Sequence, residues 1–418
     1  MRDLSKNTVR ANAAIALCAA TFFGSYPAAA AEMHAAEALA YFSDNYREAR
    51  AKFLSAAKAS GGRIESFENP LSGPQGETLS LDVAAFGTKH PPIIIVLSSG
   101  THGVEGFAGS AIQIGLLREG IATGLSPDIG ILMIHAINPY GFAYLRRVNE
   151  DNVDLNRNFV DHSSLHPENL GYSALAEAIA PQTLSFWDNT ASRVSLLWYR
   201  VRHGSQALRE AITGGQYSHP KGLFYGGRGE TWSNKTIRRI AKRYLAAAER
   251  VVVIDVHTGL GAYANIEIIL NSPEDSAEYR HASEWWGDDV KTTVSGESVS
   301  VHLQSTLKLA LPRMLPGVEV TAVSQEFGTL PPKDVFWALR SENWLHHHAD
   351  NTHPDSGRIK KKLLQAFYPE DAQWRLRVWQ QGRDTVKNTL ANLAIARYQY
   401  GTSRPVRPSK SSTRSARS

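Results

Sequence analysis

Two short apolar runs, each followed by a histidine, constrain the fold of this chain more than any other feature. Residues 93–97 (IIIVL) are continuously apolar, and residues 251–256 (VVVIDV) are nearly so. Runs of this kind, rich in β-branched residues, are typical of strands that are covered on both faces of a parallel sheet. His102 follows the first run and His257 ends the second. Because open α/β sheets place their ligands beyond the carboxyl ends of the strands, we expect both histidines at one edge of the sheet.

Strand-like and helix-like segments alternate along the rest of the chain. Further strands are predicted at 78–86, 129–135, 266–270 and 318–325, and helices at 37–57, 109–118, 232–250 and, as one or two helices, 361–393. The helix at 232 is expected to be capped by Thr231 or Ser233. This alternation predicts the α/β class, as a three-layer α/β/α domain with a mixed, mostly parallel central sheet.

The two ends of the chain differ in composition from the middle. Residues 1–31 combine a basic start, an apolar run and an alanine-rich end, which is the pattern of a secretory signal peptide cleaved before Glu32. A membrane anchor is the alternative, but an apolar run of about eleven residues is too short to span a bilayer comfortably. We expect a hydrolase domain over 32–400, with a helical insertion at about 165–215, and a disordered basic tail over 401–418. The expected location is the periplasm or the exterior, without stable membrane insertion.

Charge and cysteine content exclude several classes of function. The net charge is +5, but the tail contributes +5 and the first 31 residues +2, which leaves −2 for the middle of the chain. A nearly neutral domain gives no indication of a nucleic-acid-binding surface. The single cysteine, Cys18, lies in the predicted signal peptide, so a disulfide framework, a thiolate metal site and a cysteine nucleophile are excluded from the mature chain. Serine-hydrolase, phosphate-loop and dinucleotide-binding motifs are absent from the sequence.

His102, Glu105 and His257 are the candidate metal ligands. The first two lie three residues apart in THGVEG, directly after a buried strand, and can both turn toward one point. Two histidines and a glutamate form a recurring ligand set of catalytic zinc, with a fourth position left for water. Asp255 precedes His257 by two residues on the same strand face and is predicted to orient a ligand imidazole. We therefore expect one Zn²⁺ per chain; ordinary structural hydrogen bonds are the alternative.

Two further segments carry groups suited to hydrolysis. The loop 147–159 (RVNEDNVDLNRNF) has no periodicity and contains Arg147 and Arg157, and guanidinium groups bind carboxylates and oxyanions through a fork of donors. Glu326 directly follows the predicted strand at 318–325. There it is placed to act as a general base and then as a proton donor to a leaving amine. A solvated loop and a salt-bridged edge glutamate are the structural alternatives.

Taken in order, these residues resemble the pattern of zinc carboxypeptidases of the carboxypeptidase A type. The matching elements are HGVE at 102–105, Arg147, the Asn156–Arg157 pair, DVH at 255–257 and Glu326. The resemblance is closest to a bacterial branch labelled only as a domain of unknown function, and it covers about residues 42–348. It implies that the two histidines and Glu105 bind zinc.

The resemblance also implies a role for each remaining residue of the pattern. Arg147, with Arg146 as an alternative, polarises the scissile carbonyl. Asn156 and Arg157 hold the terminal carboxylate of the substrate, and Glu326 is the catalytic base. The mobile tyrosine of the digestive enzymes has no counterpart at 301–307, and the candidates for its replacement are Tyr172, Tyr217 and Tyr225.

The spacing between the motifs keeps more than one substrate class open. The number of residues between Glu105 and Asn156 is similar to that in aspartoacylase and succinylglutamate desuccinylase relatives. The element DLNR at 154–157 also resembles an element of those relatives. We expect a zinc-dependent hydrolase of an amide bond next to a free carboxylate, foremost a metallocarboxypeptidase acting on short peptides. An N-acyl amino acid amidohydrolase and a non-catalytic binding module are the alternatives.

Overall fold

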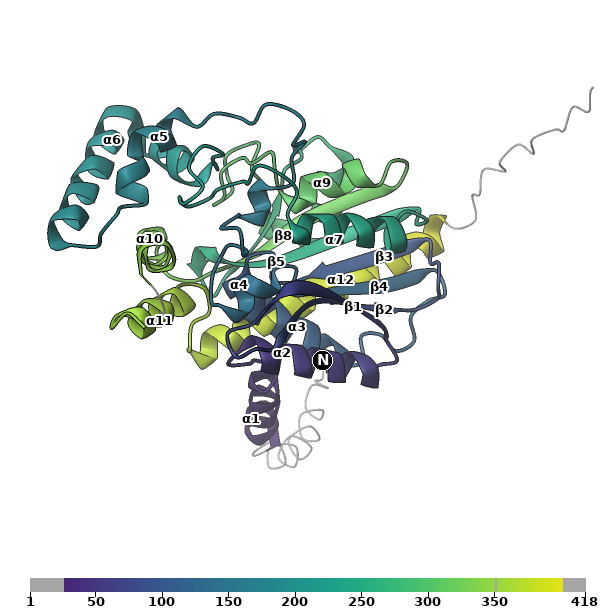
Figure 1. Ribbon diagram of the computed structural model, residues 1–418. Helices are drawn as coiled ribbons and strands as arrows, with labels where there is room; N and C mark the ends of the chain where they lie inside the picture. The colour runs from purple at the N-terminus through teal and green to yellow at the C-terminus, as the bar shows by residue number, and fades with distance from the viewer. Residues whose placement is uncertain (1–25, 350–351, 401–418) are drawn as a thin grey trace, which may run out of the picture.

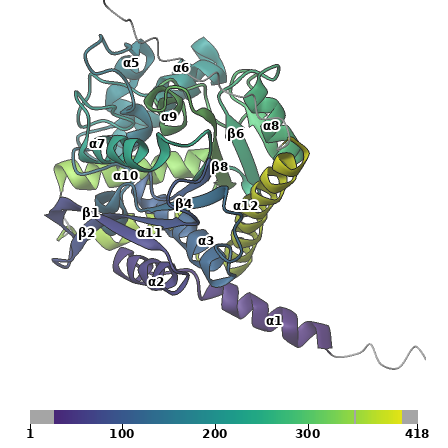
Figure 2. The ribbon, with the colours of Figure 1, turned by 90° about the vertical axis from the view of Figure 1, so that its right-hand side faces the viewer.

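The computed structural model describes residues 26–349 and 352–400 (Figure 1). The predictions made for residues 1–25 and 401–418, which include most of the signal peptide and the whole basic tail, lie outside the described residues. The helix α1 (Tyr26–Leu39) projects from the body of the protein (Figure 1 and Figure 2).

An eight-stranded mixed sheet forms the centre of the fold, with the order β1-β2-β4-β3-β5-β8-β6-β7. The strands are β1 (Arg63–Ser72), β2 (Thr78–Phe86), β3 (Ile93–Ser98), β4 (Ile129–His135), β5 (Arg250–Tyr263), β6 (Ile266–Leu270), β7 (Val290–Thr292) and β8 (Glu319–Gly328). The four central strands β4, β3, β5 and β8 run parallel, whereas β1, β2 and β6 join antiparallel neighbours. The predicted mixed, mostly parallel sheet is confirmed, and the two apolar runs are its adjacent strands β3 and β5.

Helices cover both faces of the sheet, which gives the predicted three layers (Figure 1). One face carries α2 (Tyr46–Ala59), α3 (Gly106–Arg118), α8 (Ala277–Trp286) and α12 (Ala372–Tyr400). The other face carries α7 (Trp232–Ile240) and α9 (Leu307–Met314). A third apolar cluster joins α5 (Leu170–Ile179), α6 (Phe186–Thr213), α10 (Pro332–His348) and α11 (Ser356–Phe367). These last four helices gather at one side of the molecule, at the left in Figure 1.

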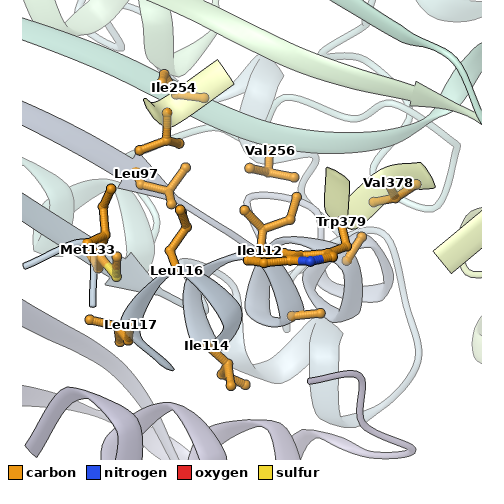
Figure 3. Close-up of a cluster of buried hydrophobic side chains, with 14 of the residues drawn as sticks. Leu97, Ile112, Ile114, Leu116, Leu117, Met133, Ile254, Val256, Val378 and Trp379 are labelled. Carbon is orange, nitrogen blue, oxygen red and sulfur yellow. The ribbon is translucent and has the colours of Figure 1, made fainter. Parts of the chain in front are cut away.

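The main core lies between the sheet and the helices α3 and α12. Figure 3 shows Leu97 of β3 and Ile254 of β5 above Ile112 and Leu116 of α3, with Trp379 of α12 beside them. Every residue of β3 is buried, as its unbroken apolar pattern predicts. Full burial of an aliphatic side chain of this size contributes about 1.5–3 kcal/mol, so this contact holds the strand ends, and the loops that follow them, in fixed positions.

Two of the predicted helices are shorter than expected. The helix predicted at 37–57 is broken, because α1 ends at Leu39 and Asn45 caps a new helix by accepting a hydrogen bond from the Glu48 amide. The helix predicted at 232–250 ends at Ile240 and continues only as a π-helical turn, Ala241–Leu245. Thr231 caps it, since its side chain accepts from the Asn234 amide.

The remaining differences concern elements with weak patterns. The edge strand β1 was not predicted, because most of its residues are exposed and it lacks an apolar run. The strand β7 has only three residues, Val290–Thr292. The short helix α4 (Pro139–Ala143) occupies what was predicted to be a plain turn, with the Asn138 side chain as its cap. Within the described residues, no helix is both long and apolar enough to cross a membrane.

Candidate metal centre and substrate cavity

His102 and Glu105 are positioned by a tight turn between β3 and α3. His102 has extended backbone, and the residues Gly103–Glu105 form a single 3₁₀ turn that leads into α3. Gly103 lies directly on the backbone of α4, since a Cβ atom there would come within 2.0 Å of the Gly141 carbonyl carbon. Only glycine permits this contact. The turn therefore brings His102 and Glu105 to the same side, although they are three residues apart.

The structure brings His102, Glu105 and His257 together, as the spacing predicted. One potential ligand atom from each of the three lies within 4.8 Å of the other two, and all three side chains are buried. The Nδ1 atoms of His102 and His257 each lie 3.0 Å from a different oxygen of the Glu105 carboxylate. The Nδ1 atom of His102 has no hydrogen-bond partner among the described residues. The lone pair of His102 Nδ1 is therefore free to bind a cation at the point where the three side chains meet.

Each histidine is held from behind by a second carboxylate. His102 Nε2 lies 3.1 Å from Asp154 Oδ1 and 2.9 Å from Arg147 Nη2, and His257 Nε2 lies 2.7 Å from Asp255 Oδ2. Asp255 is fixed in turn by the hydroxyl groups of Ser98 and Thr101. An Nε2–H that donates to a carboxylate leaves Nδ1 free to bind a metal, and this arrangement is typical of zinc-binding histidines. The donor set and its supporting carboxylates therefore fit zinc.

The electrostatics of the centre also favour a cation. Burial alone would lower the pKa of His257, but the neighbouring Asp255 and Glu105 carboxylates outweigh it and hold that pKa well above its usual range. Burial likewise opposes ionisation of Asp154, yet Arg147 and Arg157 keep its pKa well below its usual range. Three buried carboxylates thus surround two histidines, and this negative charge attracts positive charge to the centre.

Glu326 lies next to the centre on β8. It is register partner to His257 across the β5–β8 pair, and its Oε1 atom accepts a hydrogen bond of 3.0 Å from the Leu260 amide. Burial and the charge of Glu105 raise the pKa of Glu326 to about 8. A cation between the ligands would offset the Glu105 charge and favour the ionised carboxylate. One oxygen of Glu326 is therefore anchored, and the other is left for proton transfer.

The neighbouring candidates Arg146 and Arg147 contact different parts of the structure. Arg147 Nη1 donates to Glu105 Oε1 at 2.7 Å, and Arg147 Nε donates to Asp154 Oδ2 at 3.1 Å. Arg146 is buried and paired with Glu342 at 2.8 Å, and it does not line the cavity beside the centre. Only Arg147 is therefore placed to meet a substrate.

Asn156 and Arg157 follow Asp154 in a 3₁₀ turn, Leu155–Arg157, and both line the cavity. Arg157 donates to the backbone carbonyl oxygens of Asn156 and Thr213. Its Nε atom is buried without a hydrogen-bond partner among the described residues, and its nearest ion-pair partner, Asp154, is 3.8 Å away. The positive charge of Arg157 is thus only partly neutralised.

A cavity of about 890 Å³ is lined by the three candidate ligands, Glu326, Arg147, Asn156 and Arg157. Its floor contains the three candidate ligands and Glu326, and α6 contributes a wall that includes Arg193, Leu197 and Arg200. Seven lysine or arginine residues line the cavity against two glutamates: Arg147, Arg157, Arg193, Arg200, Arg209, Lys308 and Lys333, with Glu105 and Glu326. The cavity is therefore strongly cationic and suited to an anionic ligand.

The structure adds residues to which the sequence alone assigned no role. Asp154 supports His102 and Arg147 together, and its position at the start of the DLNR element was the available signal. Lys308 and Thr306 line the cavity from the region of α9, which carried no recognisable motif. None of the three tyrosines considered as replacements for the mobile tyrosine lines the cavity; Tyr217, for example, donates to the Arg157 carbonyl oxygen from behind.

Comparison with solved structures finds similar folds at low identity. The chain is similar to carboxypeptidase A from Helicoverpa armigera, with 13% identity, 83% of this chain and 74% of that chain covered, and a TM-score of 0.44. It is similar to bovine thrombin-activatable fibrinolysis inhibitor at 11% identity, covering 84% and 98%, with a TM-score of 0.45. An aspartoacylase family protein from Mesorhizobium loti has 13% identity, coverage of 68% and 66%, and a TM-score of 0.34. Because these TM-scores lie below 0.5, the chemistry of the site is inferred from its own residues.

Comparison of the sequence with family models identifies the family of the chain. No curated protein sequence matches significantly. One family model, described as "Protein of unknown function (DUF2817)", matches residues 42–381 of the 418. The match contains every candidate site residue, from His102 to Glu326. The expectation of a family labelled only by its unknown function is thereby confirmed, and the chain belongs to the DUF2817 family.

Proposed function

We propose that this protein is a zinc-dependent hydrolase that cleaves an amide bond next to a free carboxylate, acting as a carboxypeptidase on short peptides. The observation that carries the proposal is the convergence of His102, Glu105 and His257, with Glu326 beside them, at the floor of one cationic cavity. Zinc held by such a set polarises a carbonyl group and activates water for attack on it. The other steps are assigned to side chains of the chain itself.

Substrate orientation is assigned to Arg157 and Asn156. Arg157 faces the cavity with an unpartnered Nε atom and a charge that is only partly neutralised. A guanidinium group binds a carboxylate through two parallel hydrogen bonds and so fixes its orientation as well as its position. A substrate held there by its terminal carboxylate presents the preceding amide bond to Glu326 and the three ligands.

Proton transfer is assigned to Glu326. The Leu260 amide occupies its Oε1 atom, so Oε2 is the atom that takes a proton from the attacking water. The same oxygen then returns the proton to the leaving amine nitrogen, which balances the hydrolysis. Arg147, which lines the cavity beside Glu105, supplies donors for the negative charge that develops on the carbonyl oxygen.

The size of the cavity favours peptides over N-acyl amino acids. At about 890 Å³, it lies near the upper end of the roughly 300–1,000 Å³ typical of small-molecule sites. The helix α6 contributes part of the lining, and we assign this part of the cavity to residues on the amino-terminal side of the cleaved bond. Export from the cytoplasm, proposed from the sequence, would bring the enzyme to short peptides of the cell envelope.

The test compares each peptide with its C-terminally amidated form, using zinc-loaded wild type and Arg157→Ala. We expect wild type to release the terminal residue from the free acid and to leave the amide intact. Arg157→Ala should lose this discrimination mainly through an increased KM. Lys235→Ala, at an exposed lysine of α7 that does not line the cavity, is the control and should behave as wild type. Equal cleavage of both peptide forms by wild type would refute anchoring by the carboxylate and favour an endo-acting or deacylating enzyme.

A further inference from the structure

A buried lysine without an acidic partner lies in the wall of the cavity. Lys308 is 7% exposed and lines the cavity from the first turn of α9. Its Nζ atom donates one hydrogen bond, of 2.9 Å, to the Ile269 carbonyl oxygen. No ion pair within 4.0 Å is formed by Lys308 among the described residues. An ammonium group has three donors, so this one retains unused hydrogen-bonding capacity.

The carboxylates whose charge acts on Lys308 are Asp255, Glu326 and Glu267, and each already has other partners. Asp255 accepts from His257, Ser98 and Thr101. Glu326 accepts from the Leu260 amide, and Glu267 accepts from the Ser298 hydroxyl and the Val299 amide. Burial without a direct counter-ion disfavours the charged ammonium form and lowers the pKa of Lys308 to about 7, whereas an anion bound beside it would favour that form. A ligand anion is therefore the partner that this position lacks.

Thr306 adds a second unused group at the same place. It is the N-cap residue of α9, but its side chain does not make the usual hydrogen bond to the first turn of the helix. Its Oγ1 atom has no partner among the described residues, although the residue is only 4% exposed and lines the cavity. The hydroxyl group is thus free to donate to a ligand.

This pair adjoins the proposed carboxylate anchor. The amide of Leu307, which stands between Thr306 and Lys308, donates to Asn156 Oδ1 at 3.1 Å. Asn156 is the neighbour of Arg157. A single amino acid can therefore place its α-carboxylate at Arg157 and extend its side chain toward Lys308.

We propose that Lys308 and Thr306 form a second anion-binding subsite, which selects substrates whose C-terminal residue has an acidic side chain. The proposal rests on the proposed function, since it names the substrate class of that same site. Such a substrate has two carboxylates on one residue, as glutamate does.

The experiment uses two matched peptides that end in glutamate or in its neutral isostere glutamine, with zinc-loaded enzyme. We expect wild type to prefer glutamate by roughly 10- to 100-fold in kcat/KM, the range of a hydrogen bond to a charged group. Lys308→Met should lose this preference by slowing hydrolysis of the glutamate peptide alone. Thr306→Val should reduce the preference less. Lys235→Met, at an exposed lysine of α7 that does not line the cavity, is the control for general loss of charge and should retain the preference.

A second readout separates this proposal from the proposed function. Calorimetry should show that wild type binds free glutamate more tightly than glutamine and that Lys308→Met binds both alike. Equal loss of hydrolysis of both peptides in Lys308→Met would overturn the subsite and assign Lys308 to support of Glu326. Equal cleavage and equal binding of both ligands by wild type would also overturn it. If no peptide is cleaved but glutamate is still preferred in binding, the subsite stands and the carboxypeptidase proposal fails.

Discussion

His257 and Glu326 face each other across adjacent parallel strands, as register partners of β5 and β8. Neighbouring strands lie about 4.8 Å apart, and partner side chains point to the same face of the sheet. The proposed third ligand and the proposed base are therefore held at one strand spacing by backbone hydrogen bonds. Because this distance is set by the sheet, each of the two groups can be changed separately while the other stays in place.

Replacement of His257 by alanine should remove the metal. The three ligand atoms converge within 4.8 Å, and two protein ligands bind zinc much more weakly than three. Metal analysis of the purified protein should find one zinc per chain in wild type and almost none in His257→Ala, with loss of hydrolysis. His281→Ala, at a partly exposed histidine of α8, should keep its zinc. Stoichiometric zinc in His257→Ala would place the centre elsewhere.

Replacement of Asp154 by asparagine should weaken metal binding without abolishing it. Asp154 holds His102 Nε2 at 3.1 Å and also holds the Arg147 guanidinium. Loss of such a supporting carboxylate typically lowers metal affinity by about 10- to 100-fold. Competition with a zinc chelator measures the change. Asp161→Asn, which alters an exposed aspartate after the same loop, is the control. Unchanged zinc affinity in Asp154→Asn would show that His102 needs no such support.

Glu326→Gln should keep zinc and lose turnover. The amide is nearly isosteric and can still accept the Leu260 hydrogen bond, but it cannot take a proton from water. General-base catalysis contributes about 10²–10⁴-fold, and kcat should fall by an amount in that range while zinc content stays at one per chain. Near-normal turnover in the zinc-loaded variant would assign the base to another residue.

The buried group of Arg146, Glu342 and Lys360 should contribute to stability in a pH-dependent way. Glu342 lies 2.8 Å from both cations. Burial alone would raise its pKa, but the two positive charges outweigh burial and lower it to about 2. A depressed carboxyl pKa stabilises the fold above the unfolded-state value of about 4.3. This stability is lost as pH falls toward 2.

Glu342→Gln should therefore lower the free energy of unfolding at pH 7 by about 3–5 kcal/mol, because it leaves the buried Arg146 and the partly buried Lys360 without their anion. Urea unfolding at several pH values measures the difference from wild type. The difference should be constant above pH 5 and shrink between pH 4 and 2. A difference that does not depend on pH would mean that the loss reflects packing and not charge.

The first residues are predicted to be removed on export. The basic start, the apolar run and the alanine-rich end at 28–31 motivate this. Mass spectrometry of the protein purified from the cell envelope should find an N-terminus close to Glu32. Recovery of the intact chain from the cytoplasm would contradict the proposed location.

The sequence alone determined the strands that carry the site. The runs at 93–97 and 251–256 predicted buried strands of a parallel sheet, and this predicted that His102 and His257 lie at one edge of it. The H-x-x-E spacing and the position of Asp255 also followed from local geometry, since residues three apart in a turn and two apart on a strand share a side. These features depend on near neighbours in the chain, which periodicity and motif spacing report.

Only the tertiary structure decided which groups meet across long distances in the chain. Nothing in the sequence distinguished Arg146 from Arg147; packing turns the first to Glu342 and the second to Glu105. Nor did any motif mark Lys308, which reaches the cavity because α9 packs between Asn156 and Ile269. These contacts join residues 39 to 196 positions apart in the chain. They depend on the whole fold, because a side chain has no fixed direction until the elements around it are packed.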